Sequence, residues 1–437
     1  MKPRRPQPTA LKTPKSALVK IEKPIYGGAF LTRFEGKATF VPLTLPGEQA
    51  SIRIVEDKRS YATAEPEAIV SPAPNRIVPR CHHFGACGGC SYQHATYEMQ
   101  IEFKLQILRE TLQRAGVQPP DQTDVLVGQP WGYRNRIRLA FDSAGRVGYR
   151  SRRSHEIIPI RECPIAAPLL ERAALQASEI LLKDRPAFRP IEISLFCDTD
   201  EHALLASIHV NEPATRGFGE FVSLWKAQVP ELAGVECVQE GSANERSRQL
   251  ARWGQSSILY RAAGSDYHVD HGAFFQVNRW LIDAFVEQIV GSHQGKVAWD
   301  LFAGVGLFAR QLTSSFEEVI AIESAPAATP ALKQNLDGTT AKALITDTLS
   351  FLKSQSRAAT PDLIVVDPPR AGLGPEITAR LGDIAAPALV YVSCDPSTLA
   401  RDLKALLTSG YSLVSVTLAD LFPQTFHLET VVTLRKS

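Results

Sequence analysis

Short runs of alternating apolar and polar residues dominate the first part of the chain. Between residues 18 and 70, about four or five such runs, each bounded by turn residues, predict short β-strands. Strands of this length and spacing favour a small β-barrel of the OB type, a common scaffold for binding nucleic acid. A Pro-containing linker follows over residues 71–79, and residues 101–115 then carry apolar side chains at helical spacing. Gly116 and the Pro-Pro pair after it should end this helix.

The pattern changes twice in the rest of the chain. Residues 123–260 read as mostly β. From about residue 275, apolar strands alternate with helix-compatible stretches; the strand-like runs are 297–302, 319–324, 341–347, 362–369 and 388–394. This alternation indicates an α/β domain with a doubly wound parallel sheet. Residues 411–418 and 427–434 should close that sheet as an antiparallel hairpin.

These changes of pattern suggest four segments. They are a disordered arm over 1–15, an OB-like barrel over 16–70, a mostly β central domain over 71–270 and the α/β domain over 271–437. Because no apolar run approaches the roughly 18 residues that a membrane span needs, we expect no membrane partner. No secretory signal is evident either, so we expect a cytoplasmic protein whose seven cysteines are thiols or metal ligands.

Charge is distributed unevenly along the chain. The formal net charge is +2, but residues 1–15 carry +5 and residues 133–161 carry +6, which leaves the rest acidic. The second basic stretch holds Arg134, Arg136, Arg138, Arg146, Arg150, Arg152, Arg153 and Arg161. Two basic patches on an acidic body suit a polyanionic partner. A disordered tail and a solvated arginine face would explain the same charges.

Acidic residues follow successive strands of the predicted parallel sheet. The glycine-rich turn 300–306 ends the first strand, Glu323 ends the second, Asp347 follows the third and Asp367 ends the fourth. The carboxyl ends of parallel strands line the ligand crevice of such sheets, where an acid can accept hydrogen bonds from ribose hydroxyls. Each acid alone could be a helix cap or a turn residue. The motif does not separate a nicotinamide cofactor from S-adenosylmethionine.

A cysteine ends the fifth predicted strand. Cys394 is therefore close to the crevice, and residues 426–429 bring His427 and Glu429 toward the same sheet edge. One thiolate and one base are what methylation at carbon 5 of uracil needs, because addition of the thiolate at carbon 6 activates carbon 5 and a base must then remove its proton. A lone cysteine can equally be a small buried hydrophobe.

A second group of cysteines lies in the middle of the chain. Three thiols within ten residues, separated by glycines, and a fourth further on form the set Cys81, Cys87, Cys90 and Cys163. Zinc with His82 or His83 as optional ligands fits this spacing. Iron–sulfur ligation fits it equally well.

Together, these motifs resemble the RNA (uracil-5-)-methyltransferases, in particular the 23S rRNA (uracil-5-)-methyltransferase branch with a TRAM domain and a [4Fe-4S] cluster. The resemblance covers nearly the whole chain after the arm. It rests on the segments FVPLTLPGE, CHHFGACGGCSYQH, YRNRIRL, SHEIIPIRECP, FFQVN, DLFAGVG, DPPR, SCDP and FHLET. The resemblance implies a Rossmann-like class I methyltransferase domain, an N-terminal TRAM domain and a monomer that methylates carbon 5 of a uridine.

The resemblance also implies roles for individual residues. Cys394 would be the nucleophile and Glu429 the proton-abstracting base. The residues implied to contact S-adenosyl-L-methionine are Gln276, Phe302, Glu323, Asp347 and Asp367. The cluster ligands would be Cys81, Cys87, Cys90 and Cys163, with the cluster structural or facing the RNA. Two positions depart from the family pattern: Leu307 stands where Asn is common, and His271 where Pro is usual.

The resemblance favours 23S rRNA as the substrate, with the T-loop of tRNA as the alternative. Two other classes of protein are alternatives to this one. A nicotinamide-dependent oxidoreductase is favoured only by the glycine-rich turn and has no use for Cys394. A non-catalytic iron–sulfur RNA-binding protein would need neither Cys394 nor Glu429.

Overall fold

The computed structural model describes residues 16–437 except 212, 214, 240, 242–246 and 356–359. The predicted arm over residues 1–15 lies outside the described residues. The chain forms two compact units, Met1–Leu108 with Pro423–His427, and Arg109–Phe422 with Leu428–Ser437. Among the described residues, no helix is both long and apolar enough to cross a membrane.

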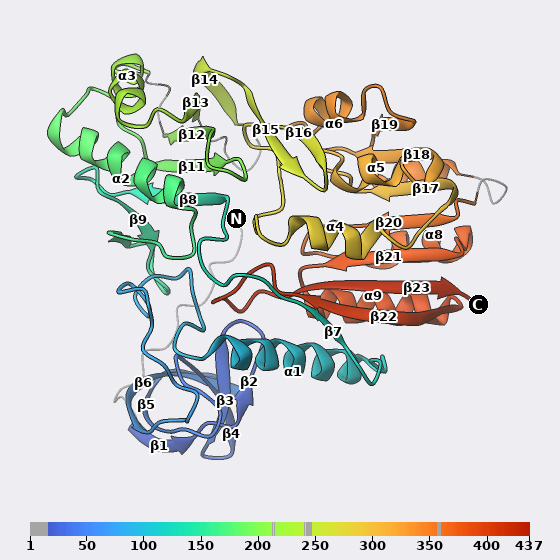
Figure 1. Cartoon of the computed structure of the whole chain (residues 1–437). Coiled ribbons are helices and arrows are strands. Elements are labelled where there is room, and N and C mark those ends of the chain that lie inside the picture. The colour runs from blue at the N-terminus through green and yellow to red at the C-terminus, as the bar shows by residue number, and fades with distance from the viewer. Residues whose placement is uncertain (1–15, 212, 214, 240, 242–246, 356–359) are drawn as a thin grey trace, which may run out of the picture. The chain divides into compact units, whose positions relative to one another are not determined.

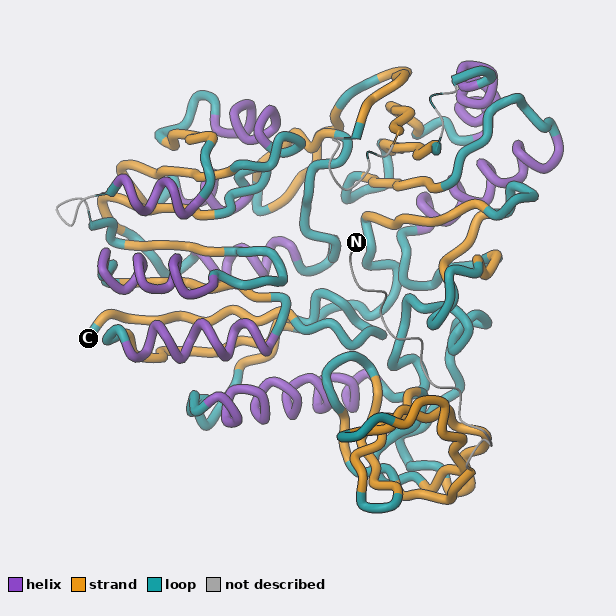
Figure 2. Tube along the Cα trace, turned by 180° about the vertical axis from the view of Figure 1, so that it is seen from behind, coloured by secondary structure: helices purple, strands orange, loops and turns teal. Residues whose placement is uncertain are grey.

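The first unit contains a curled six-stranded sheet. Its strands are β1 (Ser16–Lys20), β2 (Lys23–Pro24), β3 (Ala29–Phe34), β4 (Lys37–Pro42), β5 (Gln49–Asp57) and β6 (Tyr61–Ser71), in the order β1-β5-β6-β4-β3-β2. Figure 2 shows the strands curling around a common interior. Alternate residues such as Phe30, Val41 and Ile52 are completely buried there. The predicted OB-like barrel is confirmed.

Helix α1 (Tyr97–Ala115) begins in the first unit and ends in the second. The helix ends because of the backbone conformation of the glycine that follows it. Gly116 has a φ of 82°, a left-handed conformation that glycine adopts without steric cost. The amide of Gly116 donates to the carbonyl of Gln113 at 3.0 Å, and the amide of Val117 donates to that of Leu112 at 3.0 Å. This pair of bonds is a Schellman motif, and it confirms the predicted stop.

The second unit opens with a seven-stranded mixed sheet. The strands are β8 (Arg136–Phe141), β9 (Val147–Arg150), β10 (Ile157–Pro159), β11 (Glu192–Cys197), β12 (Leu204–Val210), β13 (Leu232–Gln239) and β14 (Arg248–Gly254), in the order β10-β9-β8-β11-β12-β13-β14. Helices α2 (Pro168–Lys183) and α3 (Phe218–Gln228) pack on it. The mostly β character predicted for this part of the chain is correct.

An eight-stranded sheet forms the rest of the second unit. Its strands are β17 (Gly295–Leu301), β18 (Phe316–Glu323), β19 (Ala341–Ile345), β20 (Leu363–Val366), β21 (Ala388–Ser393), β22 (Tyr411–Ala419), β23 (Glu429–Lys436) and β7 (Asp124–Leu126), in the order β19-β18-β17-β20-β21-β23-β22-β7. The first five strands in this order run parallel, and β23 pairs antiparallel with both β21 and β22. The predicted parallel sheet and closing hairpin are therefore confirmed. The parallel pairing of β7 with β22 was not anticipated.

Helices cover both faces of this sheet. They are α4 (Ile282–Val290), α5 (Leu307–Leu312), α6 (Thr329–Leu336), α7 (Thr348–Ser354), α8 (Gly374–Ile384) and α9 (Pro396–Thr408). In Figure 1, α4 lies in front of the sheet and α9 behind it. A hairpin of β15 (Ser257–Ala262) and β16 (Ser265–Asp270) packs its buried residues into the same core. The core holds the carboxyl ends of the parallel strands in fixed register, and the candidate site lies at those ends.

Candidate active site

The turn after β17 is built from left-handed residues. Phe302, Gly304 and Gly306 have φ values of 68°, 56° and 90°. A Cβ on Gly306 would lie 2.9 Å from the side chain of Leu332, so close packing also demands glycine at this position. A Cβ on Gly304 would meet nothing within 4 Å, which leaves the backbone there open to a ligand. The turn has the form that a nucleotide-binding crevice needs.

Glu323 closes this turn from the neighbouring strand. One oxygen, Oε2, accepts a hydrogen bond from the amide of Gly304 at 2.8 Å. The other, Oε1, accepts from the amides of Ser324 and Ala325, each at 2.6 Å. Because a carboxylate offers about four acceptor positions, the fixed and partly exposed Glu323 can still accept hydrogen bonds from ribose hydroxyls.

Asp347 caps the helix that follows β19. Its side chain accepts a hydrogen bond from the amide of Ser350 at 2.9 Å, and this bond holds the pKa of the carboxyl below its usual range. The alternative considered for this acid, a helix cap, therefore applies. The carboxylate is also exposed at the crevice end of its strand, so the cap leaves acceptor capacity for a ligand.

Two more carboxyl groups belong to the site, one completely buried and one partly exposed. Asp300 is completely buried, and its Oδ2 accepts from the amide of Ala309 at 2.8 Å. Asp367 ends β20, where its oxygen Oδ2 accepts from Nε2 of Gln276 at 3.4 Å. Desolvation raises the pKa of each carboxyl to about 7. Asn135 in turn donates to the backbone carbonyl of Gln276 at 2.8 Å, which fixes the strand–loop junction.

Cys394 and Glu429 lie at the adjoining ends of two antiparallel strands. Ser393 on β21 is directly opposite Thr430 on β23, so the next residue of each strand lies at the same edge. Glu429 is only 6% exposed, and burial, with Asp367 adding to it, raises the pKa of its carboxyl well above the usual range. Burial and the neighbouring Glu429 and Asp367 raise the pKa of the Cys394 thiol to about 12, against the opposing effect of Arg370.

The structure thus brings Asp367, Cys394 and Glu429 into one electrostatically connected group. Sequence reasoning assigned no role to two residues of this site. Asp300 anchors the start of α5, and Arg370 acts on the thiol with an effect opposite to that of the carboxyls. Arg370 follows the strand end at Asp367 by three residues, and that proximity is a signal that could have identified it.

Comparison with known proteins agrees with this geometry. The tRNA (Uracil-5-)-methyltransferase family matches residues 354–437, and the TRAM domain matches residues 15–66. A 23S rRNA (uracil(1939)-C(5))-methyltransferase RlmD of Shewanella frigidimarina is 32% identical, with 93% of this chain and 92% of the relative covered. An RNA methyltransferase of Thermotoga maritima is 30% identical over 96% of this chain and 98% of the relative. The chain belongs to the RNA (uracil-5-)-methyltransferase family.

A solved structure supports the same fold for this methyltransferase. The Pyrococcus abyssi tRNA (uracil-54, C5)-methyltransferase, determined with S-adenosyl-L-homocysteine, superimposes with a TM-score of 0.77. The two chains are 23% identical, and the match covers 96% of this chain and all of the other. The expected fold class, family and activity are confirmed: the protein is an S-adenosylmethionine-dependent methyltransferase that acts on carbon 5 of uracil in RNA.

Leu307, the first of the two departures from the family pattern, is explained by packing. It is the first residue of α5, is 6% exposed and belongs to the core of the methyltransferase sheet. Its side chain therefore stabilises the start of the helix from the interior.

The cysteine set predicted to hold a metal is split between the two units. Cys81, Cys87 and Cys90 belong to the first unit and are partly exposed, whereas Cys163 belongs to the second and is buried. An all-thiol set suits an iron–sulfur cluster by its chemistry. Within the described ranges, however, no group of three or more His, Cys, Asp or Glu side chains is arranged to hold a metal ion. The [4Fe-4S] ligation stays a prediction.

Ion pairs reduce the net positive charge of the arginine-rich stretch. Glu192 receives both Arg138, at 2.6 Å, and Arg150, at 2.5 Å. Arg146 pairs with Asp142 at 2.7 Å within a tight turn. The surface offered to a polyanion is therefore less basic than the count of arginines suggests, because some of these arginines already form exposed ion pairs with carboxylates.

Proposed function

We propose that this methyltransferase forms a covalent adduct with uracil, with Cys394 as nucleophile and Glu429 as base. The observation that supports this proposal is the register of β21 and β23, which sets a thiol beside a buried carboxyl. In the first step, Cys394 gives up its proton to solvent, its sulfur forms a bond to carbon 6, and the electron pair of the carbon 5–carbon 6 double bond moves to form an enolate. Carbon 5 then takes the methyl group, which S-adenosyl-L-methionine supplies on a positively charged sulfur.

The adduct must then lose the proton on carbon 5. Glu429 accepts this proton, the electron pair returns to the ring, and the bond between Cys394 and carbon 6 breaks. The products are 5-methyluracil, S-adenosyl-L-homocysteine and one released proton. A buried carboxyl with a raised pKa is suited to this step, because its proton affinity lies closer to that of the group it deprotonates.

We assign the cofactor contacts to residues on successive strand ends. Glu323 would accept hydrogen bonds from the ribose, and Asp347 would meet the adenine amine. Gln276 and Asp367, already bonded to each other, would lie near the methyl-bearing sulfur, where a carboxylate is favoured by the positive charge. Phe302 would contribute its backbone at the left-handed turn.

We further propose that residues 16–70 and 71–270 bind RNA while residues 271–437 catalyse the reaction. The pairing of β7 with β22 means that residues 124–126 also support the catalytic sheet. A cytoplasmic location and a monomeric state belong to the same proposal.

The RNA that we propose as substrate is 23S rRNA. The relative from Shewanella frigidimarina, which this chain matches over 93% of its length, is named for that activity. We expect purified enzyme to methylate protein-free 23S fragments, whose loops contain partly unstacked uridines, and to leave unmodified tRNA untouched. Nucleoside mass spectrometry of both RNAs after incubation measures this directly. Efficient methylation of the tRNA T-loop, with every ribosomal fragment refused, would reverse the assignment and leave the chemistry intact.

We also propose that Cys81, Cys87, Cys90 and Cys163 hold a [4Fe-4S] cluster. Protein purified without oxygen should be brown and contain about four irons per chain, as an all-thiolate cluster requires. Cys87→Ser should lose colour, iron and thermal stability together. Cys237→Ala, at a buried cysteine of β13 outside the set, is the matched control and should keep the iron. Stoichiometric zinc without iron contradicts the proposal.

A further inference from the structure

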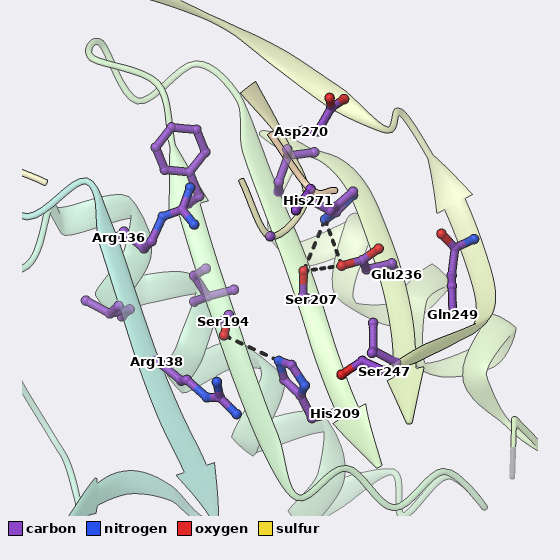
Figure 3. A pocket seen from close by; sticks show the side chains of 17 residues that line it. Arg136, Arg138, Ser194, Ser207, His209, Glu236, Ser247, Gln249, Asp270 and His271 are labelled. Carbon is purple, nitrogen blue, oxygen red and sulfur yellow. Dashed lines mark hydrogen bonds and ion pairs between the residues drawn. The ribbon is translucent and has the colours of Figure 1, made fainter. Parts of the chain in front are cut away.

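A cavity of about 570 Å³ lies over the seven-stranded sheet (Figure 3), and its lining residues include neither Cys394 nor Glu429. Strands β8 and β11–β14 supply most of its wall, and residues 270–272 and Ala327 supply the remainder. Pockets for small ligands span roughly 300–1,000 Å³, so one nucleotide fits within this volume. None of the residues assigned above to the nucleophile, the base or the cofactor lines it.

Polar side chains cross the cavity floor in a single row. The strand register places Arg138 opposite Ser194, Ser194 opposite Ser207, and Ser207 opposite Glu236. Residues that are directly opposite on neighbouring strands share one face of a sheet. With strands about 4.8 Å apart, this row spans about 14 Å from the backbone of β8 to that of β13. One end of the row therefore carries Arg138, whose charge is paired with Glu192, and the other, anionic end carries the carboxylate of Glu236.

The anionic end is held in a fixed orientation. Ser207 Oγ donates to Oε1 of Glu236 at 2.6 Å, and Nδ1 of His271 lies 3.3 Å from the same hydroxyl, as Figure 3 shows. His271 is itself positioned by the carbonyl of Gln255, 3.3 Å from its Nε2. These contacts use part of the acceptor capacity of Glu236, and a carboxylate retains room for further N–H donors. His271, the second departure from the family pattern, thus belongs to this cavity.

The β8 end of the cavity carries a second guanidinium, that of Arg136. Arg136 lies over the ring of Phe196, 4.5 Å from its centroid, directly opposite it in the strand register. Its Nε is buried and has no hydrogen-bond partner among the residues that the structure describes. Burial lowers the pKa of this arginine to about 10, so it stays charged at neutral pH. An arginine with a buried and unbonded Nε is stabilised by an anion such as phosphate, and its planar group can stack on a base.

We propose that this cavity binds one unstacked guanosine of the substrate RNA, distinct from the uridine that is methylated. The phosphate or the base plane would meet Arg136, and the base edge would meet Glu236. Guanine is favoured because two adjacent N–H donors on its Watson–Crick edge match the two oxygens of a carboxylate, whereas uracil and adenine present a donor beside an acceptor. The cavity therefore adds sequence specificity at a second position of the RNA. The inference rests on RNA being the substrate and not on which RNA it is.

The test is a cycle of one protein change and one RNA change. In an RNA that the wild-type enzyme methylates, each unpaired guanosine near the target is replaced by inosine, which lacks the 2-amino group. At one position, we expect inosine to lower kcat/KM by about tenfold, as loss of a specific base contact does. Glu236→Gln should cost about as much on the native RNA, and the two changes together should cost little more than either alone.

The matched control is Glu179→Gln, an exposed carboxyl of α2 outside the cavity, which should leave every kcat/KM value unchanged. Unchanged affinity for S-adenosyl-L-methionine shows that Glu236→Gln is folded. The proposal is overturned if inosine lowers kcat/KM equally at every position. It is also overturned if, at every guanosine, the fold losses from inosine and from Glu236→Gln multiply as independent effects do. If free guanosine monophosphate competes with the RNA but no guanosine of the RNA is coupled to Glu236, the proposal is overturned in favour of a site for a soluble nucleotide. If no RNA is methylated, RNA affinity replaces kcat/KM in the same cycle, so failure of the substrate assignment is separated from failure of this site.

Discussion

The Cys394→Ala variant should lose methyl transfer by more than about 10³-fold, because removal of a covalent nucleophile eliminates the pathway itself. Without sulfur at carbon 6, carbon 5 of uracil has too little electron density to attack a methyl group. The affinity for S-adenosyl-L-methionine should change little, since the thiol acts on the base and not on the cofactor. Single-turnover transfer of a labelled methyl group and equilibrium titration of the cofactor measure the two quantities separately.

Two further variants make this result specific. Cys394→Ser keeps the size and a weak nucleophile, and it should be as inactive as the alanine variant because a hydroxyl loses its proton far less readily than a thiol. Cys237→Ala, at a buried residue of β13 in the seven-stranded sheet, should retain wild-type turnover. Turnover by Cys394→Ala at a rate near that of the wild type would rule out a covalent mechanism.

The pKa of the thiol explains why the cofactor and Arg370 matter to this step. Burial and two nearby carboxyls raise the pKa of Cys394 to about 12, so the free enzyme holds the thiol in its unreactive, protonated form. Arg370 already opposes this effect. A cationic sulfonium in the same crevice acts in the same direction, because a nearby positive charge favours the thiolate. We therefore expect the thiol to lose its proton more readily when the cofactor is bound.

The sequence predicted the strand ends more accurately than the contacts between them. Asp367 and Cys394 could be placed at one edge because parallel strands read as apolar runs and their carboxyl ends coincide. Strand β23 pairs with β21 as well as with β22. This pairing depends on the register across the sheet, which the periodicity of the sequence does not reveal. That pairing is what brings Glu429 beside the thiol.

Other features depended on contacts that are distant in sequence. Arg138 and Arg150 both pair with Glu192, which lies more than forty positions away along the chain. Counting arginines therefore overestimated how basic the surface is. The row from Arg138 to Glu236 likewise exists only in the folded sheet. Local patterns predicted the parallel strands of the catalytic sheet but not the order in which they pair, because side-chain periodicity is local and strand order is not.

Glu429→Gln should trap the methylated adduct on Cys394. The amide keeps the shape of the side chain but cannot accept the proton from carbon 5, so elimination of the thiolate is blocked after methyl transfer has occurred. We expect a protein–RNA species that survives denaturing gels, carries the labelled methyl group and forms with nearly every active site, while release of product falls by about 10²–10⁴-fold, the usual contribution of a general base.

The double variant Cys394→Ala with Glu429→Gln gives the decisive control, because it should form no adduct at all. If Glu429→Gln instead releases methylated RNA at the wild-type rate, another group removes the proton and the base must be reassigned. Asp367 would then be the first candidate. It is the other acid whose charge acts on the thiol, and burial raises the pKa of its carboxyl to about 7, which suits proton transfer near neutral pH.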